Sequence, residues 1–172
     1  MVHPTWQAEV YAVLKAAGIT QIGYVPDAGH RHLIEAAHAD PDMKPVVLTT
    51  EEEGIALAAG AWLGGARCAL LMQSSGVGNC INMLSLPVNC RMPFLTLVTM
   101  RGEWGEFNPW QVPMGTAAPH VLTAAGVHVR RAERPDEVAE MVAAAAAFAF
   151  DSQVPVAVLL SQRLIGAKVW VK

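Results

Sequence analysis

The sequence is poor in charged and in aromatic residues. Of its 172 residues, 16% are charged and 6% are aromatic, and the net charge is −3. Because no surplus of Lys or Arg is present to neutralise phosphates, this balance argues against a nucleic-acid-binding protein. No apolar run reaches the ~20 residues that a membrane-spanning helix needs. We therefore expect neither nucleic acid nor membrane among the partners.

Cysteine is also scarce, with Cys68, Cys80 and Cys90 as the three thiols and no C-x-x-C pair. An odd number of cysteines without that spacing argues against a disulfide framework and against a zinc site. The N-terminal residues do not show the charged-then-apolar pattern of a signal peptide. We expect a cytoplasmic protein with reduced thiols and no metal ligands in this chain.

Apolar residues, in contrast, make up 53% of the chain, and most of the excess is Ala, Val, Leu and Met. This share exceeds the usual range of about 45–50% for globular chains. A large subunit interface is the natural place for the surplus. The length is typical of one domain, so we expect residues 1–172 to form a single unit.

Six apolar, strand-like runs alternate with helical segments. The expected strands are residues 21–25, 45–49, 68–72, 94–98, 127–129 and 154–160. The expected helices are residues 5–17, a second that begins at Asp27 or His30, then 51–63, 79–88, 116–125 and 135–150, with a loop at 101–115 and a polar tail after 160. Continuous apolar strands joined by crossover helices indicate an α/β fold, a doubly wound, six-stranded and mostly parallel sheet with helices on both faces.

In such sheets ligands bind at the carboxyl ends of the strands. Polar or glycine-rich segments follow four expected strands, at residues 25–30, 49–54, 73–79 and 100–106. Residues 74–79 lack the third glycine of a dinucleotide-binding loop and the Gly-Lys pair of a phosphate loop. They predict either a turn where the backbone approaches a ligand or partner, or a plain strand-to-helix turn.

The acidic triplet Glu51-Glu52-Glu53 begins the expected third helix. Carboxylates at a helix N-terminus complement the helix dipole, which is the simplest interpretation. The helix that follows is nearly free of polar residues, so at least one of the three side chains should lie against apolar surface. Burial favours the neutral form of a carboxyl group, which is a proton donor.

Basic and aromatic side chains also stand near the strand ends. His30, Arg31 and Arg101 are candidates for binding an anionic substrate, with surface or capping roles as the alternative. Trp104 and Trp110 in the expected loop indicate an aromatic lid, an interface anchor, or a loop pinned to the core. The sequence has no H-E-x-x-H metal motif and no G-x-S-x-G hydrolase motif.

Four segments carry a resemblance to a known family. They are Val25-Pro26-Asp27, the triplet with Gly54 leading to Ala58-Ala59-Gly60-Ala61, residues 72–79 with Asn82, and Arg101-Gly102-Glu103. With these motifs, nearly the whole chain resembles the pyrimidine-binding domain of thiamine-diphosphate-dependent 2-oxo acid decarboxylases. It is most similar to the α subunits of sulfopyruvate decarboxylases and to the matching part of phosphonopyruvate decarboxylases.

The resemblance implies that thiamine diphosphate is the cofactor. In this family a glutamate donates a hydrogen bond to the cofactor's aminopyrimidine ring, which favours the imino tautomer that removes the C2 proton. A gap-free count back from Gly60 assigns this catalytic role to Glu51, with Glu52 and Glu53 as alternatives. The other residues implied to bind the cofactor are Pro26, Asp27, Ser75, Gly76 and Asn79.

Full-length members hold the diphosphate and its magnesium with a Gly-Asp-Gly motif and a later Asn, and this sequence has no Gly-Asp-Gly. The resemblance therefore implies half of a split enzyme. A separate β subunit would bind the diphosphate and magnesium in an α2β2 or larger assembly. The substrate would be a short 2-oxo acid, such as sulfopyruvate or phosphonopyruvate. A non-catalytic regulatory subunit and a flavodoxin-like small-ligand module are the alternatives.

Overall fold

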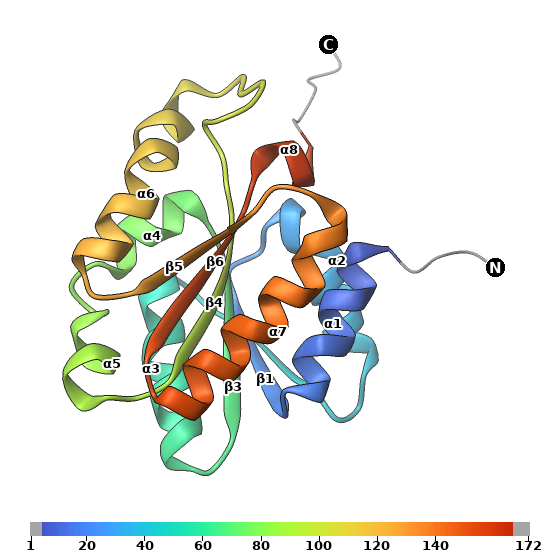
Figure 1. Ribbon diagram of the computed structural model, residues 1–172, viewed down its shortest axis with the longest axis vertical. Coiled ribbons are helices and arrows are strands. Elements are labelled where there is room, and N and C mark those ends of the chain that lie inside the picture. Colours follow the sequence, from blue (N-terminus) through green and yellow to red (C-terminus); the bar gives the residue numbers. More distant parts are fainter. Residues whose placement is uncertain (1–4, 167–172) are drawn as a thin grey trace.

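The computed structural model describes residues 5–166 and shows one six-stranded sheet between two layers of helices (Figure 1). The strand order is β2-β1-β3-β4-β6-β5, and all five neighbouring pairs are parallel. The strands are β1 (Ile19–Tyr24), β2 (Lys44–Val47), β3 (Arg67–Gln73), β4 (Phe94–Thr99), β5 (His128–Ala132) and β6 (Pro155–Leu160). The predicted doubly wound α/β fold is confirmed.

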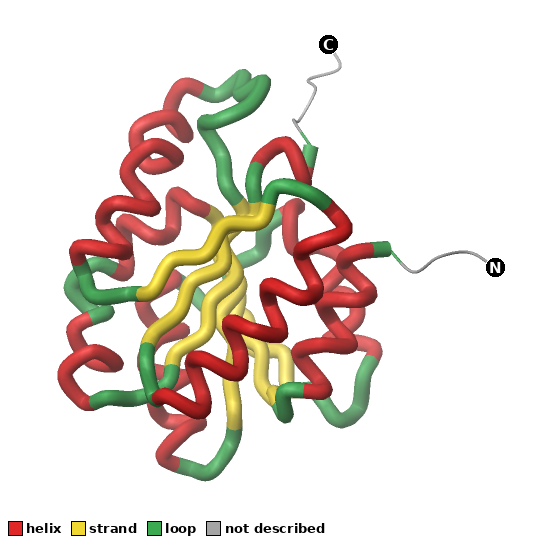
Figure 2. The backbone as a smooth tube through the Cα atoms, in the orientation of Figure 1, coloured by secondary structure: helices red, strands yellow, loops and turns green. Residues whose placement is uncertain are grey.

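The helices divide between the two faces of this sheet (Figure 2). On one face lie α1 (Trp6–Ala16), α2 (Arg31–Ala39) and α7 (Pro135–Ser152). On the other lie α3 (Glu51–Leu63), α4 (Ser74–Cys80), α5 (Ser85–Cys90) and α6 (Val112–Ala124). Short 3-10 helices, η1 (Ala28–His30) and η2 (Pro109–Gln111), precede α2 and α6.

Side chains of the central strands alternate between two separate cores. In β3, Ala69 and Leu71 pack with α1 and α7, whereas Leu70 and Met72 pack with α3 and α4. All four side chains are fully buried. This explains why the run is continuously apolar in the sequence, since both faces of the strand are covered.

The direction in which strands are added reverses at β1, which has β2 on one side and β3 on the other. A crevice outside the carboxyl ends of the strands forms at such a switch point and is the usual ligand site of open α/β sheets. Because all strands are parallel, the four polar segments predicted from the sequence follow strands at one edge of the sheet.

The prediction of a turn at residues 74–79 followed by one helix to residue 88 was wrong. α4 begins directly at Ser74, and a separate α5 follows a turn. Pro87 lies in the first turn of α5, where its missing N–H is not needed, whereas inside a longer helix it would remove a hydrogen bond and clash with the preceding turn. Ser75, Gly76 and Asn79 are therefore residues of α4, and the helix fixes their positions relative to one another.

The predicted long loop at 101–115 was also wrong in extent. Helical structure begins at Pro109, so irregular backbone covers only residues 101–108. Pro109 and Pro113 occupy first-turn positions of η2 and α6, where proline's fixed φ favours a helix rather than a loop. In place of a polar tail, β6 is followed by α8 (Gln162–Ile165), and residues 167–172 lie outside the described residues.

Candidate functional site

Glu51 is the first residue of α3 and its carboxylate lies against the first turn of α4. Only 8% of the residue is exposed, and Asn79 Nδ2 donates a hydrogen bond of 2.8 Å to Oε2. A Cβ atom placed on Gly76 would clash with Glu51 Oε1, so only glycine permits this approach. Oε1 accepts no hydrogen bond from the described part of the chain, which leaves it available to a ligand.

The two neighbouring glutamates make local contacts instead. Thr50 Oγ1 donates to Glu52 Oε2 at 2.5 Å, and this hydrogen bond lowers the pKa of Glu52. The backbone N–H of Thr49 donates to Glu53 Oε2 at 2.9 Å, and Glu53 is exposed. Of the triplet, only Glu51 is buried, in agreement with the gap-free count, and its catalytic role stays a prediction.

Cys80 lies in the same helix layer as this carboxylate. Burial, together with the nearby charges of Glu51 and Glu52, raises the pKa of its thiol to about 12. A thiol in that state is not a nucleophile at neutral pH. Cys80 is therefore not a candidate nucleophile of this site.

Asp27 joins the ends of three strands. Its Oδ1 accepts from Gln73 Nε2 at 2.9 Å, and its Oδ2 accepts from Thr99 Oγ1 at 2.7 Å and from the N–H of Gly29 at 3.1 Å. Gln73 in turn accepts a hydrogen bond of 2.8 Å from Ser75 Oγ. The carboxylate of Asp27 is thus occupied by protein donors, whereas Ser75 is exposed.

His30 lies inside the protein rather than at the rim. It is 1% exposed, and its Nε2 lies 3.1 Å from the carbonyl oxygens of both Met72 and Leu97. Burial lowers the pKa of the imidazole. The neutral ring then donates its Nε2–H to these carbonyl groups, so His30 ties η1 to β3 and β4, and its role toward a substrate stays a prediction.

Arg101 forms a buried ion pair with Glu106. Arg101 Nε and Nη2 donate to the two carboxylate oxygens at 2.7 and 2.6 Å, and the side chains are 7% and 4% exposed. The hydrogen bonds from Arg101 are the largest cause that lowers the pKa of Glu106 to about 2. The guanidinium charge is therefore neutralised within the chain, although the sequence indicated an anion-binding residue.

Arg31, in contrast, is exposed and lines an open pocket of about 380 Å³ with Pro26 and Asp27. Among the three basic residues selected from the sequence, it is the one whose charged group is both accessible and next to the switch point. Pro26 is exposed at the same place. The structure thus brings together Pro26, Asp27 and Arg31 at one end of β1, and Glu51, Gly76 and Asn79 between α3 and α4.

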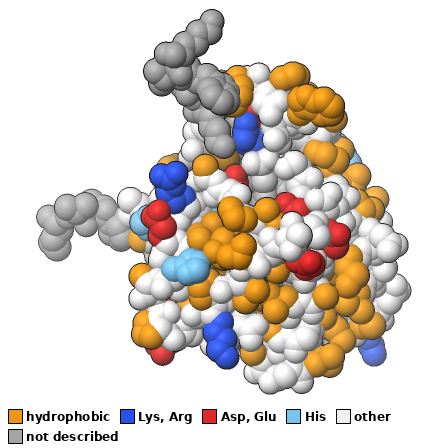
Figure 3. All heavy atoms as spheres, turned by 180° about the vertical axis from the view of Figure 1, so that it is seen from behind, with side chains coloured by type: hydrophobic (Ala, Val, Ile, Leu, Met, Phe, Trp, Pro, Cys, Tyr) orange, Lys and Arg blue, Asp and Glu red, His pale blue; other side chains and the backbone are white. Residues whose placement is uncertain are grey.

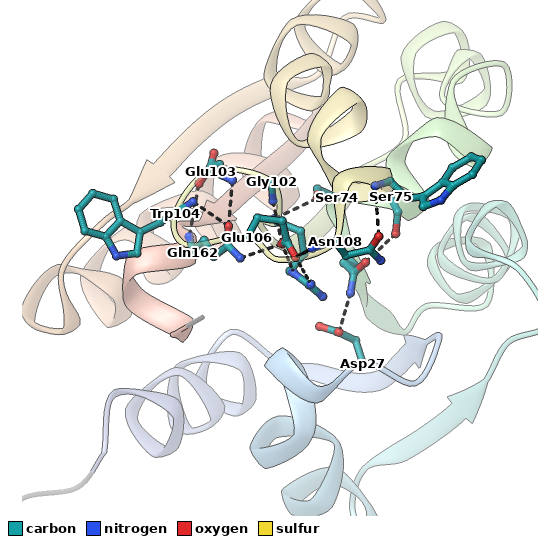
Figure 4. A network of polar contacts seen from close by, with 12 residues as sticks. Asp27, Ser74, Ser75, Gly102, Glu103, Trp104, Glu106, Asn108 and Gln162 are labelled. Atoms are coloured by element: carbon teal, nitrogen blue, oxygen red, sulfur yellow. Dashed lines mark hydrogen bonds and ion pairs between the residues drawn. The ribbon is translucent and has the colours of Figure 1, made fainter. Parts of the chain in front are cut away.

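Glu106 and Gln162 were missed from the sequence. Gln162 Oε1 accepts from the N–H groups of Glu103 and Trp104 at 2.8 Å, and its Nε2 donates to Glu106 at 2.9 Å (Figure 4). Together they fix residues 101–108 against α8. The one available signal was an acidic residue five positions after Arg101, because a buried arginine needs a carboxylate partner.

One face of the molecule combines acidic and apolar side chains (Figure 3). On the face seen in Figure 3, a group of acidic side chains lies between broad hydrophobic areas. Trp104 and Trp110 are 55% and 88% exposed. Between residues 5 and 166, no helix is long and apolar enough to cross a membrane, and no three potential metal ligands converge.

Comparison with solved structures defines the class of this fold. The chain superposes with a TM-score of 0.73 on 2-oxoglutarate:ferredoxin oxidoreductase from Magnetococcus marinus, at 15% identity over 94% of the chain. It superposes with a TM-score of 0.71 on a putative thiamin diphosphate-dependent enzyme from Mycobacterium smegmatis, at 18% identity over 92% of the chain. It corresponds to 29% and 30% of those longer chains. The chain therefore has the same α/β fold as one part of this oxidoreductase and one part of this putative thiamin diphosphate-dependent enzyme.

Sequence relatives narrow this class to a family, although no family model matches the chain. The sulfopyruvate decarboxylase α subunit of Methanothermobacter thermautotrophicus is 40% identical over 88% of this chain and 92% of its own length. The α subunit of Methanococcus maripaludis is 34% identical over 88% and 91%. A phosphonopyruvate decarboxylase of Streptomyces viridochromogenes is 39% identical over 58% of this chain and 25% of its own length. The chain belongs to the family of sulfopyruvate decarboxylase α subunits.

Proposed function

We propose that this chain is the pyrimidine-binding α subunit of a thiamine-diphosphate-dependent enzyme that decarboxylates a short 2-oxo acid. The observation that carries the proposal is the buried carboxylate of Glu51, which lies against Gly76, is oriented by Asn79 and keeps Oε1 free. A carboxyl group held in this way fits a flat heteroaromatic ring that offers one nitrogen acceptor. Family membership supports the same assignment.

Each residue of the glutamate site has a separate task in this proposal. Glu51 holds a proton at Oε1 and shares it with the ring nitrogen, and Asn79 fixes the carboxyl plane by its hydrogen bond to Oε2. Gly76 leaves room for the carboxyl group at the first turn of α4. Thiamine diphosphate, when bound, supplies the carbon nucleophile and the electron sink for loss of carbon dioxide.

A separate β subunit completes the enzyme in this proposal. The sequence has no Gly-Asp-Gly motif for the diphosphate, and the relatives are named as α subunits, which implies a partner chain. The β subunit would hold the diphosphate and magnesium in an α2β2 or larger assembly. Exposed aromatic side chains at Trp104 and Trp110 are suited to an interface with that subunit, since aromatic residues are enriched at interface hot spots.

The substrate is proposed to be a 2-oxo acid with a second acidic group, such as sulfopyruvate or phosphonopyruvate. The relatives carry these names. Arg31 is an accessible cation beside the switch point, whereas the imidazole of His30 is buried and the guanidinium of Arg101 is paired with Glu106. A sulfonate or phosphonate group is a suitable partner for an arginine side chain.

The test combines reconstitution with three isosteric variants. The chain is mixed with the candidate β subunit, thiamine diphosphate and magnesium, and both turnover of the 2-oxo acid and exchange of the cofactor's C2 proton are measured. Loss of acid–base assistance in Glu51→Gln should reduce both rates by about 10²–10⁴-fold. Glu52→Gln and Glu53→Gln are the controls and should cost much less. Normal C2 exchange in all three variants would refute activation of the cofactor by this chain, and a selective loss in Glu52→Gln would move the role to that residue.

A further inference from the structure

A chain of three hydrogen bonds runs from the sheet interior to the rim. Thr99 Oγ1 donates to Asp27, the Gln73 amide donates to Asp27, and Ser75 Oγ donates to Gln73. Figure 4 shows Asp27 and Ser75 at the same end of the strands as the loop after β4. Ser75 is the exposed end of this chain, and it precedes Gly76, against which Glu51 lies.

The direction of these hydrogen bonds is fixed by Asp27. An ionised carboxylate only accepts hydrogen bonds, so the Gln73 side chain must turn its NH₂ group toward Asp27. The Gln73 oxygen then faces Ser75, and the serine hydroxyl must donate its single proton to it. The lone pairs of Ser75 Oγ are what remains for a ligand.

We propose that Asp27 is a positioning residue that makes Ser75 a hydrogen-bond acceptor, so that Ser75 selects a ligand group that carries an N–H or O–H donor, such as an exocyclic amine. This proposal rests on the proposed function only for the identity of the ligand. It gives Asp27 a role beside the cofactor binding that the family resemblance implies, because Asp27 acts on Ser75 through Gln73.

The discriminating experiment exchanges the carboxylate and the amide. Asp27→Asn keeps the shape and still accepts from Thr99 and Gly29, but its new NH₂ group faces the NH₂ of Gln73. Gln73 must then reverse, and Ser75 must turn its proton outward. The double variant D27N/Q73E restores the original direction, since the new amide at position 27 donates to a carboxylate at position 73 and that carboxylate accepts from Ser75. Asp27→Asn and the double variant are nearly isosteric with the wild type, so each serves as the structural control of the other.

Binding of thiamine diphosphate to the assembled complex with magnesium is measured by calorimetry. We expect Asp27→Asn and Ser75→Ala each to weaken binding of thiamine diphosphate by about 10-fold. A change of this size is typical when one hydrogen bond to a ligand is lost or its direction is reversed. The double variant should bind within about 3-fold of the wild type, and Asp27→Asn should add no loss in the Ser75→Ala background. A double variant no better than Asp27→Asn, or a full further loss in the Ser75→Ala background, would overturn the proposal.

A second measurement uses the isolated chain and needs neither partner nor cofactor. In NMR spectra the side-chain amide protons of Gln73 should show the shift and slow exchange of a hydrogen bond to a carboxylate, and both should be lost in Asp27→Asn. Unchanged Gln73 signals in that variant would refute the inference. If the wild-type complex binds no thiamine diphosphate, the proposed function fails, while these signals still decide whether Asp27 sets the direction of the Ser75 hydrogen bond.

Discussion

Replacement of Glu106 by glutamine should destabilise the chain in a pH-dependent way. The ion pair with Arg101 lowers the pKa of Glu106 from 4.5 to about 2. One pKa unit corresponds to about 1.4 kcal/mol, so ionised Glu106 contributes roughly 3 kcal/mol to the free energy of unfolding at neutral pH. Glu106→Gln leaves the buried guanidinium of Arg101 without its counter-charge, and a loss of about 3 kcal/mol is the expected result.

The sign of the pH dependence follows from the lowered pKa. The contribution is fully present above the unfolded pKa of 4.5 and is lost as the pH falls toward the folded value of about 2. At pH 3 the difference between wild type and variant should therefore have shrunk by about 2 kcal/mol. Urea denaturation followed by circular dichroism at pH 7 and pH 3 measures both values.

Glu103→Gln is the matched control, because Glu103 pairs with Arg131 in the same region but with 22% and 36% of the side chains exposed. An exposed pair of this kind contributes at most about 1 kcal/mol. Equal losses for Glu103→Gln and Glu106→Gln at pH 7, or a Glu106→Gln loss that is the same at both pH values, would refute the assignment of Glu106 as the buried counter-charge.

Three further outcomes are expected. Gly60→Ala should stabilise the isolated chain by about 0.5–1 kcal/mol in thermal unfolding, because Gly60 lies within α3 and no heavy atom lies within 4 Å of an added Cβ; a destabilised variant would contradict the helix geometry. Gly76→Ala should abolish C2 exchange in the reconstituted enzyme, because its Cβ would clash with Glu51 Oε1 and displace the carboxylate; wild-type exchange would show that this contact is dispensable. Tryptophan emission should shift to shorter wavelength when the β subunit is added, and Trp110→Phe should reduce the shift, since Trp110 is 88% exposed; an unchanged spectrum would argue against an interface at this loop.

Much of the fold was predictable because β3, β4 and β6 are short, largely apolar and buried runs separated by helical segments. The sequence pattern of β3 and β6 has one simple solution, burial on both faces of a parallel sheet. The predicted secondary structure was wrong at positions where proline or glycine is compatible with either a helix or a loop. Pro109 and Pro113 begin helices although proline is also typical of loops, and Gly76 lies in a helix although glycine is also typical of turns.

The candidate site was predictable in part. The burial of one glutamate followed from the apolar sequence of α3, and the structure turns Glu51 inward. The accessibility of the basic residues was not predictable, because it depends on contacts between segments far apart in sequence. His30 is bound by carbonyl groups of β3 and β4, and the surroundings of Arg101 and Glu106 include Gln162, 56 residues after Glu106.

The two cores on opposite faces of the sheet separate the packing of α1 and α7 from the part of the site around Glu51. Glu51, Gly76 and Asn79 belong to the α3 and α4 layer, whereas α1 and α7 cover the other face with a core of their own. Substitutions at distant, independent sites usually have additive effects. The α1 and α7 layer can therefore accumulate changes, by natural drift or by engineering, that raise or lower the melting temperature while the geometry around Glu51 is conserved.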